Sequence, residues 1–317
     1  MKTEEEKTPS GSQRTNSEGH KIESINNIQS SDDGFKQEKF VSAISNIRMT
    51  TKGSSQVPAE QPSLENAYGM TKWFEKDLAK SGISLELAAD LDIASVHHEE
   101  FFSIIGFKPN TRGMPVAGYK IPFKNPDGSP VLTPDGNFYA RVRLQHPHFN
   151  REGKPVRYLA PISSGIYPYI ISPVHKFLMD NPRFPLVLTE GEKKIICAWY
   201  CNKTPVIGIS GIWGWLESKH VRDELGEPDL INAGLARYLN GQRGCVIIFD
   251  SDCTEPEKAA SFDICAFRLA RELKIKFNTQ LLRINLPADD SGEKIGLDDY
   301  IMKNNNRLLL EVLFGQQ

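Results

Sequence analysis

Acidic residues stand at the ends of two apolar runs in the second half of the chain. The run "LVLTE" closes on Glu190, and "VIIFDSD" closes on Asp250 and Asp252, one residue apart. Two carboxylates held this close repel each other unless a cation neutralises them, and a set of oxygen ligands favours Mg²⁺ or Mn²⁺. The pattern therefore predicts a divalent-metal site with Asp250 and Asp252 as ligands.

The residues directly after Glu190 indicate that the protein binds an anion beside the metal ion. In "GEKK", Lys193 and Lys194 fall in the first turn of a predicted helix. Positive charge there opposes the helix dipole, and the free N–H groups of a helix start attract phosphate. We therefore expect these two lysines to face an anion such as a phosphate group.

Two further acids, Asp298 and Asp299, follow a long loop in "KIGLDDYI" and are weaker candidates for the same metal site. Each acid taken alone has a plainer interpretation, because Asp is common at helix N-caps and in surface loops. The set as a whole favours the metal site.

The elements that must position these residues follow Pro185, where apolar runs alternate with amphipathic helical segments. The expected strands lie in "LVLTE", "TPVIGIS", "CVIIFDSD" and "TQLLRINL". This alternation predicts an α/β fold with a mostly parallel sheet and helices on both faces, over residues 185–317. Ligands of such sheets bind where strands end at their carboxyl edge, so the acids should meet there.

The residues before this domain differ from it in composition and in the elements that they predict. Residues 1–60 are rich in Ser, Asn, Gln, Glu and Lys, and we expect a disordered tail. Residues 61–184 should form a helical lead-in and then a smaller α+β subdomain, whose antiparallel hairpins are indicated by two Pro-Asp-Gly turns.

This smaller subdomain is basic although the whole chain carries a formal charge of only −2. Residues 101–185 hold 11 Lys or Arg against 4 Asp or Glu. Arg141 and Arg143 alternate along one predicted strand, and Lys154, Arg157 and Tyr158 follow closely. Cations interleaved with aromatic rings suit a single-stranded nucleic acid, whereas the plainer interpretation is a solvated face of the sheet.

Composition places the chain among ordinary globular proteins. Hydrophobic residues make up 39% and charged residues 25%. The five cysteines include no CxxC pair, which fits reduced thiols better than a disulfide scaffold. With neither an apolar signal core at the N-terminus nor a run of about 20 apolar residues, we expect a cytoplasmic protein without a membrane partner.

The order of "TEGEKK", "FDSD" and "KIGLDDYI" resembles the TOPRIM domain of DnaG-type primases, topoisomerases, OLD-family nucleases and recombination proteins. The likeness is strongest to primase-like proteins of phages, plasmids and other mobile elements. These include a domain of unknown function in which "LTEGEKK", "GIWGW" and "GLDDY" recur. The basic subdomain in turn resembles the N-terminal part of the DnaG-type catalytic core.

The resemblance implies a role for each acid. Glu190 would be the acid/base or metal-linked carboxylate, and Asp250 and Asp252 would hold Mg²⁺ (or Mn²⁺), with Asp298 and Asp299 as further metal candidates. Arg141, Arg143, Lys154, Arg157, Tyr158, Lys193 and Lys194 would bind nucleic acid or nucleotide. No Cys/His zinc module and no P-loop helicase accompany the core, so template selection should depend on the tail or on another protein.

We therefore expect a primase-like nucleotidyltransferase that acts on single-stranded DNA and nucleoside triphosphates in the replication of a mobile element. A replicative helicase or another replication protein is the expected protein partner. Two alternatives stay open. One is a TOPRIM nuclease that uses the same acids with water as nucleophile, and the other is a noncatalytic adaptor that binds nucleic acid. We do not expect a topoisomerase, because 317 residues are too few for the cleavage domains that accompany one.

Overall fold

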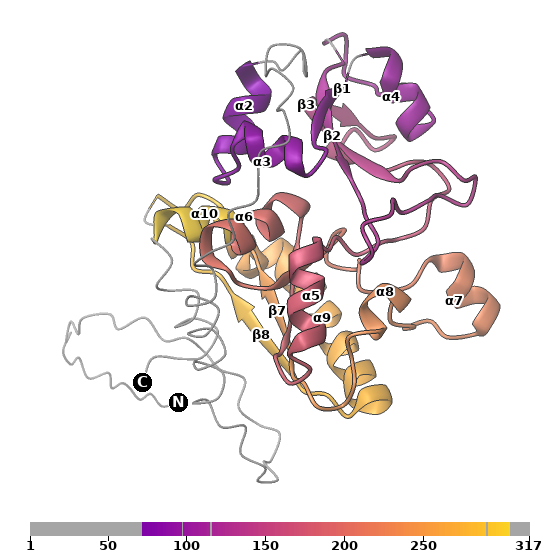
Figure 1. Ribbon diagram of the computed structural model, residues 1–317, viewed down its shortest axis with the longest axis vertical. Coiled ribbons are helices and arrows are strands. Elements are labelled where there is room, and N and C mark those ends of the chain that lie inside the picture. The colour runs from indigo at the N-terminus through magenta and orange to yellow at the C-terminus, as the bar shows by residue number, and fades with distance from the viewer. Residues whose placement is uncertain (1–71, 97, 115, 290, 305–317) are drawn as a thin grey trace, which may run out of the picture. The chain divides into compact units, whose positions relative to one another are not determined.

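The computed structural model describes residues 72–304, with the exception of residues 97, 115 and 290. These residues fall within one unit of the chain, and the predicted tail, residues 1–60, lies outside them. They include a four-stranded antiparallel sheet and a four-stranded parallel sheet (Figure 1). In chain order the elements are α2 (Lys72–Ala79), α3 (Leu85–Asp90), β1 (Ala94–Val96), α4 (His98–Ile105), β2 (Gly118–Pro122), β3 (Ala140–Phe149), β4 (Pro155–Leu159), α5 (Ser172–Asp180), β5 (Leu186–Glu190), α6 (Glu192–Asn202), β6 (Val206–Ile209), α7 (Lys219–Leu225), α8 (Ala233–Ala236), β7 (Cys245–Phe249), the 3₁₀ turn η1 (Ser251–Thr254), α9 (Pro256–Phe277), β8 (Leu281–Asn285) and α10 (Leu297–Lys303).

The antiparallel sheet has the order β1-β2-β3-β4. The two Pro-Asp-Gly turns lie between β2 and β3, where the bridges Lys124–Pro130 and Leu132–Phe138 continue the antiparallel pairing. This confirms the predicted hairpins. The face of the sheet beneath α4 carries an apolar cluster that includes Phe101 of the helix, because alternate residues of a strand point to one side.

The parallel sheet has the order β6-β5-β7-β8. Figure 1 shows the arrows of β7 and β8 side by side. All five residues of β7 are buried, as expected for a strand that is covered on both faces. The predicted mostly parallel sheet, with its four strands in the four expected segments, is therefore confirmed.

Two crossover connections of this sheet run toward its opposite edges. The chain leaves β5 through α6 to reach β6, and it leaves β7 through α9 to reach β8. Because crossovers between parallel strands are right-handed, α6 and α9 cover opposite faces. The carboxyl ends of β5 and β7 thus flank a topological switch point, where open α/β sheets bind their ligands.

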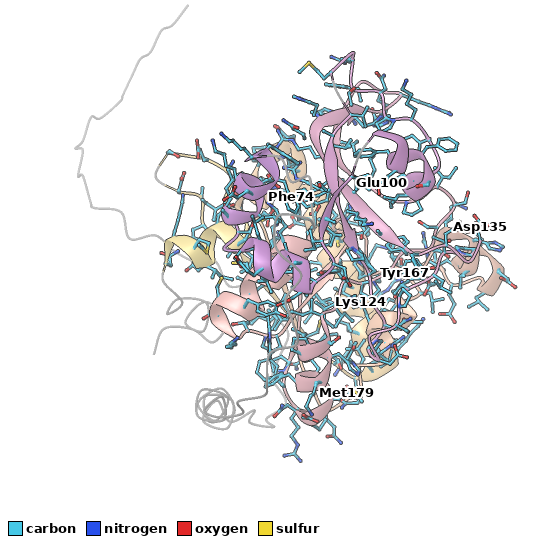
Figure 2. All side chains as sticks on the ribbon, turned by 45° about the horizontal axis from the view of Figure 1, so that its top comes forward. Phe74, Glu100, Lys124, Asp135, Tyr167 and Met179 are labelled. Carbon is cyan, nitrogen blue, oxygen red and sulfur yellow. The ribbon has the colours of Figure 1, made fainter. Side chains whose placement is uncertain are left out.

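The helical lead-in is present as α2 and α3, which residues 80–84 separate. Phe74 of α2, labelled in Figure 2, packs edge-on against Tyr119 of β2, with ring centroids 5.0 Å apart. α10 packs along α6. Within the described part of the chain, no helix has the length and apolar character that crossing a membrane requires.

Candidate functional site

The switch point of the parallel sheet is the centre of a charged pocket. Glu190 ends β5, Asp250 follows β7, and both line the pocket. With a volume of about 210 Å³ it is smaller than the 300–1,000 Å³ typical of sites that enclose a whole ligand, so it has room for a phosphate-sized group. The lining residues are Arg141, Tyr158, Glu190, Gly191, Glu192, Lys193, Lys194, Asp250, Lys294 and Asp298.

Gly191 makes the sharp junction between β5 and α6. Its φ of 99° lies in the region that side chains rarely adopt, and its N–H donates to the carbonyl of Ile209 at the end of β6. The helix therefore begins immediately after Glu190, and Lys193 and Lys194 lie in its first turn at the pocket, as the sequence predicts.

Lysines neutralise the two aspartates that follow β7. Lys194 Nζ donates to Asp250 Oδ1 at 2.5 Å, while Lys294 Nζ lies 3.1 Å from Asp250 Oδ2 and 3.0 Å from Asp252 Oδ2. Lys258 adds a bond of 2.9 Å to Asp252 Oδ2. Both carboxylates are buried, and the described residues supply no partner for Asp252 Oδ1.

The environment moves the pKa of two of these acids in opposite directions. Burial raises the pKa of Glu190, and the charge of Asp250 adds to the effect, against the opposing pull of Lys194. Burial also acts to raise the pKa of Asp252, but hydrogen bonds from Lys258 and Lys294 outweigh it, so the pKa of Asp252 lies below its usual value. Glu190 is therefore suited to holding a proton and Asp252 to staying charged.

The donor set fits a metal ion that is bound partly by these carboxylates and partly by a phosphate group of the substrate. Within the described residues, no three acidic, histidine or cysteine side chains form a group able to hold a metal ion without other ligands. Mg²⁺ is, however, commonly bound by one or two carboxylates together with substrate phosphates. Asp250 and Asp252 provide such a pair, and the unpartnered, buried Asp252 Oδ1 offers a ligand atom.

The two later acids differ in what they contact. Asp298 lines the pocket, and its Oδ2 accepts a 2.5 Å hydrogen bond from the hydroxyl of Ser81. Asp299 does not line it. Its Oδ2 accepts the N–H of Gly296 at 3.0 Å and so caps the start of α10. The contact of Asp299 is therefore that of a helix-capping residue, which is the simpler of the two interpretations of this acid.

Arg141 and Arg143 share one side of β3, as predicted, and both guanidinium groups lie within 5.3 Å of the centre of the Tyr158 ring. That side faces the protein interior. Arg143 is 8% exposed and its Nη2 bonds Asp77 Oδ1 at 3.2 Å, whereas Arg141 lines the pocket. Of the two, Arg141 is the one positioned to meet a ligand.

Lys154 and Arg157 lie outside the pocket and are exposed. Lys154 forms a surface ion pair with Glu152. Arg157 and Tyr158 are neighbours on β4 and therefore point to opposite faces of the sheet. The predicted nucleic-acid set thus separates into pocket residues and surface residues.

Sequence reasoning missed several residues of the site. Glu192 is 2% exposed, and its Oε1 accepts a 2.5 Å bond from Arg141 Nη1, which ties β3 to the start of α6. Lys294 and Asp77 were missed as well. Glu192 and Lys294 stand inside the motifs "TEGEKK" and "KIGLDDYI", which was the available signal, but nothing in the sequence near Asp77 pointed to it.

Comparison with known proteins gives a match to a family model and similarity to solved structures. The model of a domain of unknown function, DUF3854, matches residues 175–308, a span that contains all three motifs. The search of curated proteins found no match.

One structural neighbour is the Aquifex aeolicus primase (zinc-binding and RNA polymerase domains), at 14% identity and a TM-score of 0.46. The similarity covers 77% of this chain and 55% of that one, so the chain spans about half the length of this neighbour. The other is the RNA polymerase domain of Mycobacterium tuberculosis primase DnaG, at 12% identity and a TM-score of 0.48, covering 75% of this chain and 74% of that one.

Proposed function

We propose that the chain is a primase-like nucleotidyltransferase with a TOPRIM domain, which joins nucleotides on single-stranded DNA with Mg²⁺ or Mn²⁺. The observation that carries the proposal is the meeting of Glu190, Asp250 and several cations at the switch point of the parallel sheet. The assignment to replication of a mobile element, with a helicase or another replication protein as partner, rests on the motif resemblance.

The charge of the pocket favours joint binding of a nucleotide and a metal ion. Four cations and four acids line it, so its formal charge is close to zero. A triphosphate carries several negative charges and would meet no net attraction there. A divalent ion at Asp250 and Asp252 supplies the missing positive charge, so nucleotide binding should depend on the metal. The cations are Arg141, Lys193, Lys194 and Lys294, and the acids are Glu190, Glu192, Asp250 and Asp298.

Each group then has a task in nucleotidyl transfer. A bound metal ion polarises the phosphate and offsets the charge that develops on it. Lys193 and Lys194 hold phosphate oxygens at the start of α6. Glu190, whose pKa is raised by burial, would accept the proton of the 3′ hydroxyl while the hydroxyl oxygen bonds the α-phosphorus of the nucleotide and pyrophosphate leaves.

The exposed cations of the antiparallel sheet are the proposed surface for the DNA strand. Arg157 is exposed on β4, and Lys154 is exposed directly before this strand. The guanidinium of Arg112 lies 3.6 Å from the centre of the Phe149 ring. Cations bind phosphates and rings stack with bases, which together bind a single strand with little sequence preference.

The decisive experiment incubates the full chain with single-stranded DNA, labelled nucleotides and Mg²⁺ or Mn²⁺, beside the Asp250→Asn and Glu190→Gln variants. New oligonucleotides on a sequencing gel that disappear in both variants would support the proposal. Asp223→Asn is the control, because this exposed acid pairs with Lys219 on α7, does not line the pocket and should leave synthesis unchanged.

Two other results would each replace the proposal. Shortened template without new product would identify a nuclease. A template that is bound but unchanged would indicate a noncatalytic adaptor that binds nucleic acid.

A further inference from the structure

Asp77 of helix α2 contacts Lys193, a pocket residue from a distant part of the sequence. Asp77 is 7% exposed and accepts three side-chain hydrogen bonds. They come from Tyr119 Oη at 2.7 Å, Arg143 Nη2 at 3.2 Å and Lys193 Nζ at 3.2 Å. Asp77 is separated from Lys193 by 116 positions, so it is the fold that brings α2 to the start of α6.

The bonds from Lys193 determine where its charge can act. Its ammonium group has three N–H donors. Two of them bond Asp77, one at the backbone carbonyl at 2.8 Å and one at Oδ2. Lys193 lines the pocket, and no further described residue accepts a bond from its ammonium, so the third donor can meet a ligand there. The long side chain is thus held in one orientation before any ligand arrives, which lowers the entropic cost of binding.

Asp77 is suited to this task because it stays charged. Burial acts to raise its pKa, but Lys193, the hydroxyl of Tyr119 and Arg143 together lower it below the usual value. Tyr119 and Arg143 also fix the orientation of the carboxylate from the neighbouring strands β2 and β3.

We propose that Asp77 is a positioning residue of the pocket, which orients Lys193 toward a phosphate group of the bound nucleotide. The inference rests on the proposed function, since it concerns the nucleotide of that same site. Asp77 lies outside residues 175–308, the span that the family model matches, so it makes α2 part of the functional unit.

The test is a double-mutant cycle on the full chain, with ATP and Mg²⁺ as the probe and the dissociation constant from calorimetry as the readout. Lys193→Gln should weaken binding about tenfold, the loss expected for one charge-assisted hydrogen bond. Asp77→Asn should weaken it by a similar factor. The double variant should be no weaker than Lys193→Gln alone, because Asp77 acts through Lys193.

A matched control separates positioning from general stability. Asp229 is also a buried acid with two cationic partners, Arg268 and Arg271, but it does not line the pocket. Asp229→Asn should lower the melting temperature as Asp77→Asn does and leave the dissociation constant unchanged.

Replacing Asp77 leaves the buried Arg143 and the partly buried Lys193 without this counter-ion, a change that can prevent folding. The cycle is therefore also run in an Arg143→Met background, where only one of these cations remains. Independent, additive effects of Asp77→Asn and Lys193→Gln would overturn the inference, as would unchanged affinity in Asp77→Asn. If the wild-type protein bound no ATP, the proposed function itself would fall, and the inference with it.

Discussion

Lys294 provides a direct test of the metal site. Its ammonium lies between the two aspartates, 3.1 Å from Asp250 Oδ2 and 3.0 Å from Asp252 Oδ2. A divalent ion held by Asp250 and Asp252 would have to share these two carboxylates with the lysine, so lysine and metal compete for their negative charge. Replacement of Lys294 by glutamine should therefore strengthen metal binding while it weakens nucleotide binding.

The expected gain in metal affinity follows from the solvent exposure of the Lys294 side chain. The Lys294 side chain is 53% exposed, and exposed ion pairs are each worth about 0.2–1 kcal/mol. Two such pairs give roughly 1 kcal/mol, or about a fivefold gain in metal affinity. Removal of the positive charge beside the metal acts in the same direction.

The assay is an isothermal calorimetric titration of Mn²⁺ into the nucleotide-free protein, which measures the affinity for Mn²⁺. Lys303→Gln is the control because Lys303 is equally exposed, at 53%, and lies 3.0 Å from the surface acid Asp289. An unchanged or weaker Mn²⁺ affinity in Lys294→Gln would refute the reasoning. An equal gain in the control would show a general charge effect instead.

Two further predictions concern stability. Burial and the charge of Asp250 raise the pKa of Glu190 above 4.5, so the folded state binds this proton more tightly than the unfolded chain does. The wild type should therefore lose stability relative to Glu190→Gln as the pH rises from 4.5 through the raised pKa. Urea unfolding of both proteins at about pH 4 and about pH 8 measures this, and a constant difference would contradict it. Ser81→Ala should lower the free energy of unfolding by about 1–3 kcal/mol, since the buried carboxylate of Asp298 loses its donor. Ser103→Ala, which removes an exposed hydroxyl bonded to the carbonyl of Glu100, should have almost no effect; equal losses would argue against a special role for Ser81.

The parallel sheet and the acids at its edge were predictable because their signals are local. A short apolar run rich in β-branched residues, such as "CVIIF", favours an inner strand that is buried on both faces, and the residue that follows such a strand emerges at the carboxyl edge. Glu190 and Asp250 were therefore placed correctly at one edge from sequence alone. The antiparallel hairpins followed in the same way from their turn residues.

The ion partners of the site were not predictable, because they are distant in sequence. "YARVRL" shows that Arg141 and Arg143 share one side of a strand, but the packing of α2 and α6 against that side is what buries Arg143 and leaves Arg141 at the pocket. The same holds for Asp77 with Lys193, 116 positions apart, and for Ser81 with Asp298, 217 positions apart. Periodicity along a chain reports which side a residue takes within its own element. Which charge lies opposite it depends on how separate elements pack, and no local pattern carries that information.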